Sequence, residues 1–265
     1  MPSKSSKIPK YILNCVPSQD PQNDWGMESA LTADVAAAPL SLPSEVDLRE
    51  DWWKIGDQRD TGSCVGWGAG DSVIRWHLVK SNRINQDDLL SVRFIWMAAK
   101  ETDEFNSRPT TFIENEGTSL KAALDVARRL GLVLEPFVPF NSGRLFQGYA
   151  KDFYAIASNL RINAYYNLGL KQASWRNWLA KNGPILIRVN VDATWDNSDQ
   201  TGGRMVAYQP ATNRGGHAAA LVGYRPDCFI VRNSWGETWG EKGFGYASFA
   251  YARDAFTEAY GVYLV

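Results

Sequence analysis

The order of two hydrophobic periodicities limits the fold of this 265-residue chain more than any other feature. Apolar side chains recur at helical spacing in the earlier part of the chain, within 64–80, 89–101, 119–130 and 175–182. After Gly183-Pro184 the pattern changes to short β-branched or aromatic segments, at 185–191, 218–224, 228–232, 244–251 and 260–265. Helices followed by antiparallel strands are typical of α+β proteins. We therefore predict a helical lobe followed by an antiparallel sheet lobe, with a cleft between them.

The first 43 residues differ from the rest of the chain. They are rich in Pro, Ser and Asn and show no clear hydrophobic period, which is typical of an extended arm or linker. We expect the folded body to occupy 44–265, with a helical lobe over about 44–145 and a β lobe over about 146–265.

Composition and charge exclude several classes of function. The 28 basic and 29 acidic side chains nearly cancel, so no strong field would recruit nucleic acid or an anionic membrane. No apolar run approaches the roughly 20 residues of a membrane span, and the short apolar stretch 11–16 does not resemble a secretory signal. Three scattered cysteines do not form a disulfide framework. We expect a cytoplasmic monomer, although a mature secreted protein without its signal would look the same.

The chain offers only two histidines as general bases, His77 and His217. His77 lies in the same expected helix as Cys64, roughly 20 Å further along its axis. It cannot reach the Cys64 thiol if the helix is continuous, so we interpret His77 as a surface or packing residue. His217 is left as the candidate base.

Cys64 opens the first expected helix, directly after Thr61-Gly62-Ser63. A thiol in the first turn of a helix lies near the positive end of the macrodipole, which favours the nucleophilic thiolate. Glycines at 66, 68 and 70 destabilise a helix, and their spacing indicates that another element packs very close. The local pattern alone fits a reactive thiol and an inert buried thiol equally well.

A predicted hairpin near the C-terminus places Asn233 close to His217. If Tyr224 faces Cys228, antiparallel pairing places Asn233 opposite residue 219, within about two positions of His217. The Asn233 amide can then accept the imidazole N–H and hold the ring in one orientation, as the third group of a catalytic triad does. Trp235 could shield that hydrogen bond from water. Taken alone, Asn233 would be a turn residue at a strand end.

Gln58 lies on the segment that leads into the Cys64 helix. Its neutral amide, beside the backbone N–H of Cys64, could bind an oxyanion. Alone, it would be a surface glutamine.

Three sequence blocks together resemble the papain-like cysteine peptidases. Residues 58–69 read Gln-Arg-Asp-Thr-Gly-Ser-Cys-Val-Gly-Trp-Gly-Ala, and residues 216–224 read Gly-His-Ala-Ala-Ala-Leu-Val-Gly-Tyr. Residues 233–243 read Asn-Ser-Trp-Gly-Glu-Thr-Trp-Gly-Glu-Lys-Gly. The likeness runs from Leu42-Pro43 to the C-terminus and implies the papain-like two-lobe fold with the active-site cleft between the lobes.

The resemblance also implies roles for single residues. It makes Cys64 the nucleophile, His217 the general acid/base, Asn233 the orienting residue and Gln58 the oxyanion donor. It requires no cofactor and no metal.

Substrate-binding positions follow from the same resemblance. Gly117-Thr118 matches the stretch that pairs with an extended peptide, and Trp235 would flank the leaving group. Arg188, Gly215 and Gly216 would line the pocket for the second residue upstream of the scissile bond. Arg188 is unusual there; it lies in the pocket, or points away if the strand register differs by one.

The chain departs from the family pattern in three places. Val65 replaces the tryptophan that usually follows the nucleophile. Thr61 and Asn115 stand where the family carries a disulfide, which fits folding without oxidation. The pro-region of the family is usually a longer helical domain than the 43 residues found here, which leaves the means of latency open.

The resemblance predicts hydrolysis of peptide bonds in peptide or protein substrates through a thioester. The segment 11–16 could lie across Cys64 as a tethered inhibitor, which would make the chain a zymogen, or it could belong to a disordered tail. A disulfide between Cys15 and Cys64 is a more remote possibility. The alternative function is a catalytically silent domain that keeps the cleft for peptide binding.

Overall fold

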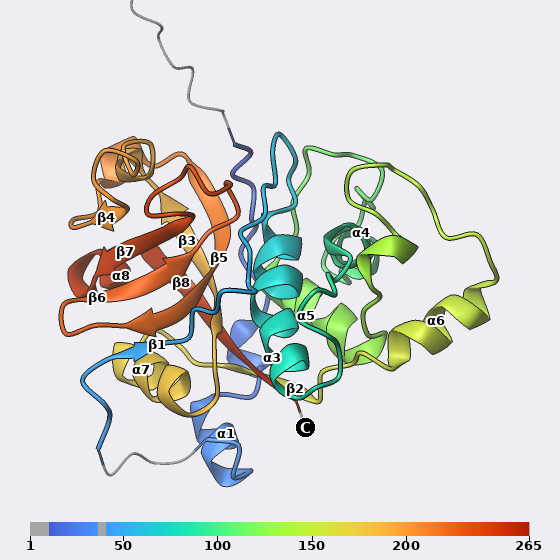
Figure 1. The fold of residues 1–265 in the computed structure, drawn as a ribbon, viewed down its shortest axis with the longest axis horizontal. Coiled ribbons are helices and arrows are strands. Elements are labelled where there is room, and N and C mark those ends of the chain that lie inside the picture. Colours follow the sequence, from blue (N-terminus) through green and yellow to red (C-terminus); the bar gives the residue numbers. More distant parts are fainter. Residues whose placement is uncertain (1–10, 37–40, 265) are drawn as a thin grey trace, which may run out of the picture.

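The computed structural model describes residues 11–36 and 41–264, and its elements form two lobes with the N-terminal arm running between them (Figure 1). The α-helices are α1 (Met27–Thr32), α2 (Cys64–Gly66), α3 (Arg75–Lys80), α4 (Val92–Thr102), α5 (Leu120–Arg129), α6 (Ala150–Ser158), α7 (Gln172–Lys181) and α8 (Phe249–Ala255). The shorter or differently wound helices are η1 (Pro21–Asn23), η2 (Trp67–Ile74), η3 (Glu135–Phe137), η4 (Ala193–Trp195) and η5 (Pro210–Thr212).

One sheet forms the core of the second lobe. Its strands are β1 (Val46–Asp47), β2 (Ala164–Asn167), β3 (Ile185–Val191), β4 (Arg204–Met205), β5 (Gly215–Tyr224), β6 (Cys228–Arg232), β7 (Phe244–Ser248) and β8 (Phe256–Tyr263). They lie in the order β2-β8-β3-β5-β6-β7-β4, with β1 paired to β5, and the named pairs are antiparallel except β4–β7. The predicted α+β class with a helical lobe and a sheet lobe is confirmed.

The predicted strand 244–251 is wrong in its second half. The strand β7 stops at Ser248, whose hydroxyl accepts a hydrogen bond from the backbone N–H of Tyr251 and caps helix α8. This cap begins a helix directly after the strand. The alternating aromatic residues of the segment indicated only a strand. The last strand consequently begins at Phe256, earlier than predicted.

The helix that begins at Cys64 packs directly on strand β5. It runs without a break through α2, η2 and α3, and η2 is wound more widely, as a π-helix. A Cβ on Gly66 would lie 2.7 Å from the Val92 carbonyl oxygen, and one on Gly68 would lie 3.0 Å from Leu186 and 3.6 Å from Ala218. The expected close packing therefore explains Gly66 and Gly68. Gly70 has only an ordinary contact at 3.4 Å.

A buried charge cluster joins the two lobes. Asp71 of η2 accepts hydrogen bonds from Arg75 at 3.1 Å and from Arg232 of β6 at 2.8 Å. The Trp53 ring lies 4.7 Å from the Arg232 guanidinium, and its indole N–H donates to the Asp71 carbonyl at 2.9 Å. Burial lowers the pKa of Arg232, and the Asp71 charge opposes that effect. The cluster ties the helix behind Cys64 to the sheet.

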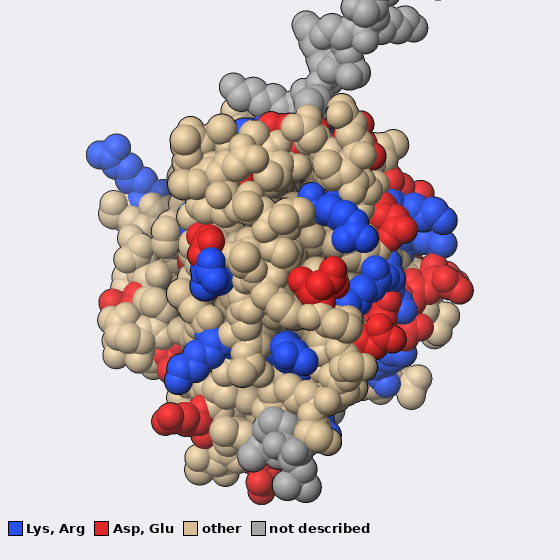
Figure 2. All heavy atoms as spheres, turned by 90° about the vertical axis from the view of Figure 1, so that its left-hand side faces the viewer, with Lys and Arg blue, Asp and Glu red and all other residues tan. Residues whose placement is uncertain are grey.

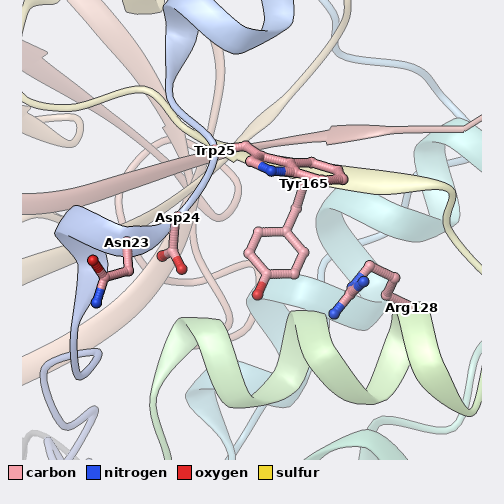
Figure 3. A pocket seen from close by; sticks show the side chains of 5 residues that line it. All are labelled: Asn23, Asp24, Trp25, Arg128 and Tyr165. Atoms are coloured by element: carbon pink, nitrogen blue, oxygen red, sulfur yellow. The ribbon is translucent and has the colours of Figure 1, made fainter.

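The arm is fastened to helix α5 and strand β8. Asp24 forms a 2.6 Å ion pair with Lys121 of α5 and accepts a 2.8 Å hydrogen bond from Tyr260 of β8. Beside it, Asn23, Asp24 and Trp25 of the arm line a cavity of about 190 Å³ together with Tyr165 of β2 and Arg128 of α5 (Figure 3). The arm also contains the short helix α1, which the sequence pattern did not predict.

The surface carries charges of both signs. On the face shown in Figure 2, Lys and Arg side chains lie among Asp and Glu side chains, with broad uncharged areas between them. Such a face creates no field of a single sign. Within 11–36 and 41–264, no helix has the length and apolar content needed to cross a bilayer.

His77 is buried rather than exposed, and it gives a prediction about stability. Burial lowers the pKa of His77 from its ordinary value of 6.5 to about 4. Between pH 4 and pH 6.5 the unfolded chain binds a proton at His77 and the folded chain does not. The contribution of His77 to the free energy of unfolding is therefore complete above pH 6.5 and is lost as the pH falls toward 4. We expect His77 to account for about 3 kcal/mol of lost unfolding free energy over this range.

Urea unfolding of the unmodified chain and of His77→Gln, at neutral pH and at acidic pH, measures this term. The variant should lose less stability on acidification than the unmodified chain. Equal losses would contradict a proton-excluding site at His77.

Candidate active site

Cys64 lies at the first position of α2 with its side chain fully buried. A hydrogen bond from the side chain of Cys15 is the largest effect that lowers the pKa of the Cys64 thiol well below its usual value. Burial opposes this shift, whereas a hydrogen bond and the positive charge of His217 and the backbone N–H of Ala218 support it. The site therefore favours a thiolate at Cys64 beside a histidine.

His217 and Asn233 meet as the hairpin argument expected. Asn233 Oδ1 lies 2.8 Å from His217 Nε2, inside the sheet lobe. The predicted starting pair was wrong, because Tyr224 pairs with Phe229, but a bulge between Leu221 and Gly223 restores the expected register. Asn233 Oδ1 also accepts a 2.8 Å hydrogen bond from the backbone N–H of Ser234, which fixes its oxygen toward the ring.

Tryptophan rings enclose the imidazole. Trp235 is 3% exposed, and its ring centroid lies 5.0 Å from that of His217. Trp195 contacts the same imidazole edge-on at 5.5 Å, while its indole N–H donates to the Tyr251 hydroxyl. The His217–Asn233 hydrogen bond is thereby kept from water, as expected for Trp235. Nothing in the sequence pointed to Trp195, because no periodicity or motif marks its position.

Gln58 is buried and oriented by two donors. Its Oε1 accepts hydrogen bonds from Ser234 Oγ at 3.1 Å and from Trp235 Nε1 at 3.2 Å. This leaves Nε2 as the outward donor, and it reaches the carbonyl oxygens of Thr61 at 3.1 Å and Ile12 at 3.3 Å. An amide held in this way points its N–H at a carbonyl oxygen of the arm.

Backbone hydrogen bonds hold the arm in the cleft. Cys15 N–H donates to the Gly216 carbonyl at 3.0 Å, and Val16 N–H donates to the Thr118 carbonyl at 3.2 Å. A Cβ on Gly117 would lie 2.2 Å from the Asn14 carbonyl oxygen, and one on Gly216 would lie 2.3 Å from that of Cys15. These glycines allow an extended chain to approach the cleft backbone closely.

The arm also covers the tryptophan at the other end of the site. The Tyr11 ring stacks on Trp235 with centroids 4.5 Å apart and an interplanar angle of 4°. The Tyr11 hydroxyl donates to the Trp235 carbonyl at 3.0 Å. The segment 11–16 thus spans the site from Trp235 to Thr118.

Arg188 points into the cleft rather than away from it. Its Nε donates to the Cys15 carbonyl at 2.9 Å and its Nη1 to Thr257 Oγ1 at 2.8 Å. Glu258 lies 3.9 Å from the Arg188 guanidinium and accepts a 3.0 Å hydrogen bond from the backbone N–H of Ser18. Sequence reasoning missed Glu258, because nothing in its own segment connects it to the distant Arg188.

The arrangement has the parts of a nucleophilic acyl-transfer site. It joins a stabilised thiolate, an oriented imidazole and a fixed amide donor around a groove that binds extended polypeptide. His77, by contrast, packs beside Trp76 and Gly183 and takes no part in it.

Comparison with known proteins gives consistent results. Residues 42–258 match the model of the papain family of cysteine proteases. The chain is 29% identical over 220 residues to cysteine proteinase B of Leishmania mexicana and 33% identical over 224 residues to cysteine proteinase 2 of Leishmania pifanoi. Each alignment covers 79% of this chain but only 45% and 46% of the respective relative, so the chain spans less than half the length of these proteins.

Solved structures agree on the fold. The chain is similar to xylellain, a cysteine protease from Xylella fastidiosa, with a TM-score of 0.77 over 96% of both chains at 19% identity. It is also similar to digestive procathepsin L 3 of Tenebrio molitor, with a TM-score of 0.67 over 96% of this chain and 77% of that chain at 17% identity. With the family model matched over most of its length, the chain belongs to the papain family of cysteine proteases.

Proposed function

We propose that this chain is a cysteine peptidase that hydrolyses peptide bonds through a thioester on Cys64. The observation that carries the proposal is the His217 imidazole, which is fixed by the 2.8 Å contact with Asn233 and interacts with the buried Cys64 thiol at the start of α2. A silent binding domain has no need of a charged nucleophile with an oriented base.

Each reacting group has one role in the proposed cycle. The Cys64 thiolate attacks the scissile carbonyl carbon, and the Gln58 amide with the Cys64 backbone N–H binds the resulting oxyanion. Protonated His217 gives its proton to the leaving amine, which leaves the acyl group on the sulfur as a thioester. His217 then takes a proton from water, whose oxygen attacks the thioester and releases the acid. Asn233 holds the ring throughout.

We further propose that the arm keeps the enzyme latent, so that the chain is a zymogen. Two backbone hydrogen bonds, the stacking of Tyr11 on Trp235 and the contact of Gln58 with the Ile12 carbonyl support this proposal. The arm thereby occupies the Gln58 amide and the backbone carbonyl groups of Gly216 and Thr118, which a substrate would use.

The direction of the arm explains why it would resist cleavage. In the proposed mode a substrate pairs its upstream residues with Thr118 and sends the residues after the scissile bond toward Trp235. The arm runs the other way, since Tyr11 contacts Trp235 and Val16, later in the sequence, bonds to Thr118. In such a reversed chain, the amide nitrogen of each peptide bond lies on the Thr118 side of its carbonyl group, away from the leaving-group side of the site.

Labelling and turnover together test the proposed activity. An epoxide inhibitor of the E-64 type should attach to Cys64, as peptide mapping would reveal, and should block hydrolysis of a fluorogenic peptide library. Labelling without hydrolysis of any peptide, by a chain freed of its arm, would favour the silent binding domain.

Arg188 should set the preference for the second residue upstream of the scissile bond. The guanidinium favours an acidic side chain over Arg there, but Glu258 at 3.9 Å offsets part of its charge. We expect Glu258→Gln to strengthen the preference for acidic residues and Arg188→Gln to reverse it toward basic residues, each by roughly tenfold in kcat/KM.

A positional peptide library supplies the measurement. Thr257→Val, which removes a neutral partner of Arg188 without changing the charge, is the matched control. A preference for Leu or Phe that is the same in all four proteins would contradict this role for Arg188.

A further inference from the structure

The arm brings a second thiol to the nucleophile. Cys15 and Cys64 are 2% and 0% exposed, both are free, both belong to the same buried cluster, and each shifts the pKa of the other. The backbone of Cys15 is held on both sides, by its N–H to the Gly216 carbonyl and by its carbonyl to Arg188 Nε at 2.9 Å. Hydrophobic packing or simple steric blockage of the cleft would require no sulfur at this position.

We propose that Cys15 is a resolving thiol for oxidised Cys64, so that hydroperoxides convert the arm into a covalent, reversible lock on the active site. The inference rests on the proposed latency and extends it from a non-covalent to a redox-controlled state. The oxidant is a small hydroperoxide, which reacts with Cys64 when the tethered segment leaves the cleft.

The chemistry balances in two steps. The Cys64 thiolate attacks one peroxide oxygen, the O–O bond breaks, and with one proton taken up the products are a Cys64 sulfenic acid and an alcohol, or water from hydrogen peroxide. The Cys15 sulfur then attacks the Cys64 sulfur, the S–O bond breaks, and water leaves as the disulfide forms. Two thiols lose two electrons in total, and one hydroperoxide is reduced.

The charges at the site favour this order of events. When Cys15 leaves, His217 and the backbone N–H of Ala218 still favour the Cys64 thiolate, so Cys64 is the group that meets the oxidant. In the closed site, burial and the neighbouring Cys64 raise the pKa of Cys15 well above its usual value. Once Cys64 is a neutral sulfenic acid, the negative charge beside Cys15 is gone. The Arg188 guanidinium, which lowers the pKa of Cys15, remains. Cys15 thus becomes a better nucleophile only after Cys64 has been oxidised.

Tethering makes the second step fast. The arm is anchored by Asp24 to Lys121 and Tyr260, so Cys15 returns to the same place after each opening. Tethered groups meet at effective concentrations in the mM range. Cys15 therefore reaches the sulfenic acid before further peroxide converts it to the sulfinic acid, which thiols do not reduce.

Peptide mapping of the full chain after a hydrogen peroxide pulse tests the proposal directly. Free thiols are blocked with iodoacetamide, and digestion without reductant should yield one cross-linked peptide pair containing Cys15 and Cys64, lighter than the sum by two hydrogens. Dithiothreitol should restore both free thiols. Cys15→Ser should instead gain two oxygens at Cys64 and fail to recover, while Cys228→Ser should behave like the unmodified chain.

The outcomes separate this proposal from the peptidase assignment. Cross-linking is read by mass, so it can be seen even if no peptide is hydrolysed. A full chain that accumulates sulfinic acid at Cys64 without the cross-linked pair overturns the proposal, as does equal recovery of the unmodified chain and Cys15→Ser. A folded Cys15→Ser is verified beforehand by its circular dichroism and its reaction with the epoxide inhibitor.

Discussion

Replacing Cys64 with Ala should lower kcat for peptide hydrolysis on the order of 10⁵-fold or more, because the covalent step loses its nucleophile. The fold should remain, since the change removes one sulfur atom from a helix end. Fluorogenic peptides and circular dichroism measure the two effects. A variant that retained even a tenth of the rate would refute the thioester mechanism.

Replacing the other residues of the site should reduce the activity by amounts that follow a definite order. His217→Ala should be nearly as damaging as Cys64→Ala, because the proton transfers depend on the imidazole. Asn233→Ala should retain measurable activity, at least about tenfold above that of Cys64→Ala, because the amide orients the ring without reacting. Cys228→Ala is the matched control, since this buried thiol lies on β6 away from the site and should leave the rate nearly unchanged.

Removing the arm should accelerate both labelling of Cys64 and peptide turnover by at least about tenfold, because a tethered segment competes at mM effective concentration. Two truncations separate the cleft segment from its anchor. A chain that starts at Gln19 loses the residues over Cys64 but keeps the Asp24 contacts and α1. A chain that starts at Leu42 loses the whole arm.

Both truncations should be activated to a similar degree if 11–16 is the inhibitory part. The full chain should approach their rates only at high substrate concentration, as an intramolecular competitor requires. Equal rates of the full chain and both truncations at all substrate concentrations would rule out an inhibitory arm.

The sequence was informative wherever local pattern and pairing arithmetic decided the structure. Strands β3 and β6 were predicted with their observed bounds, and the pairing of His217 with Asn233 followed from the hairpin length. That pairing was reached although the starting pair was displaced, because the bulge after Leu221 cancels the error. Bulges leave no reliable mark in a sequence.

What escaped prediction depends on contacts between distant segments. Glu258 and Arg188 lie on neighbouring strands, and only their register brings the two charges together. Trp195 reaches His217 from the turn after β3, a position that no periodicity marks. The position of Cys15 beside Cys64 depends on where a segment without periodicity lies, and tertiary hydrogen bonds alone determine that.

The buried Asp71 cluster bears on how a substrate enters the cleft. Pulling the lobes apart would separate Arg232 from Asp71 and leave a buried guanidinium without its counter-ion, at a cost of about 3–5 kcal/mol. Lifting 11–16 from Cys64 breaks hydrogen bonds, including the one from Arg188 to the Cys15 carbonyl, and one ring stack. Arg188 keeps Thr257 and Glu258 as partners, so lifting this segment leaves no buried ion unpaired and costs less than widening the groove. Substrate entry thus requires movement of segment 11–16, while the spacing between the two lobes stays the same. We therefore expect such a slot to accept tails, loops and unfolded chains that are already extended, rather than the compact faces of folded proteins.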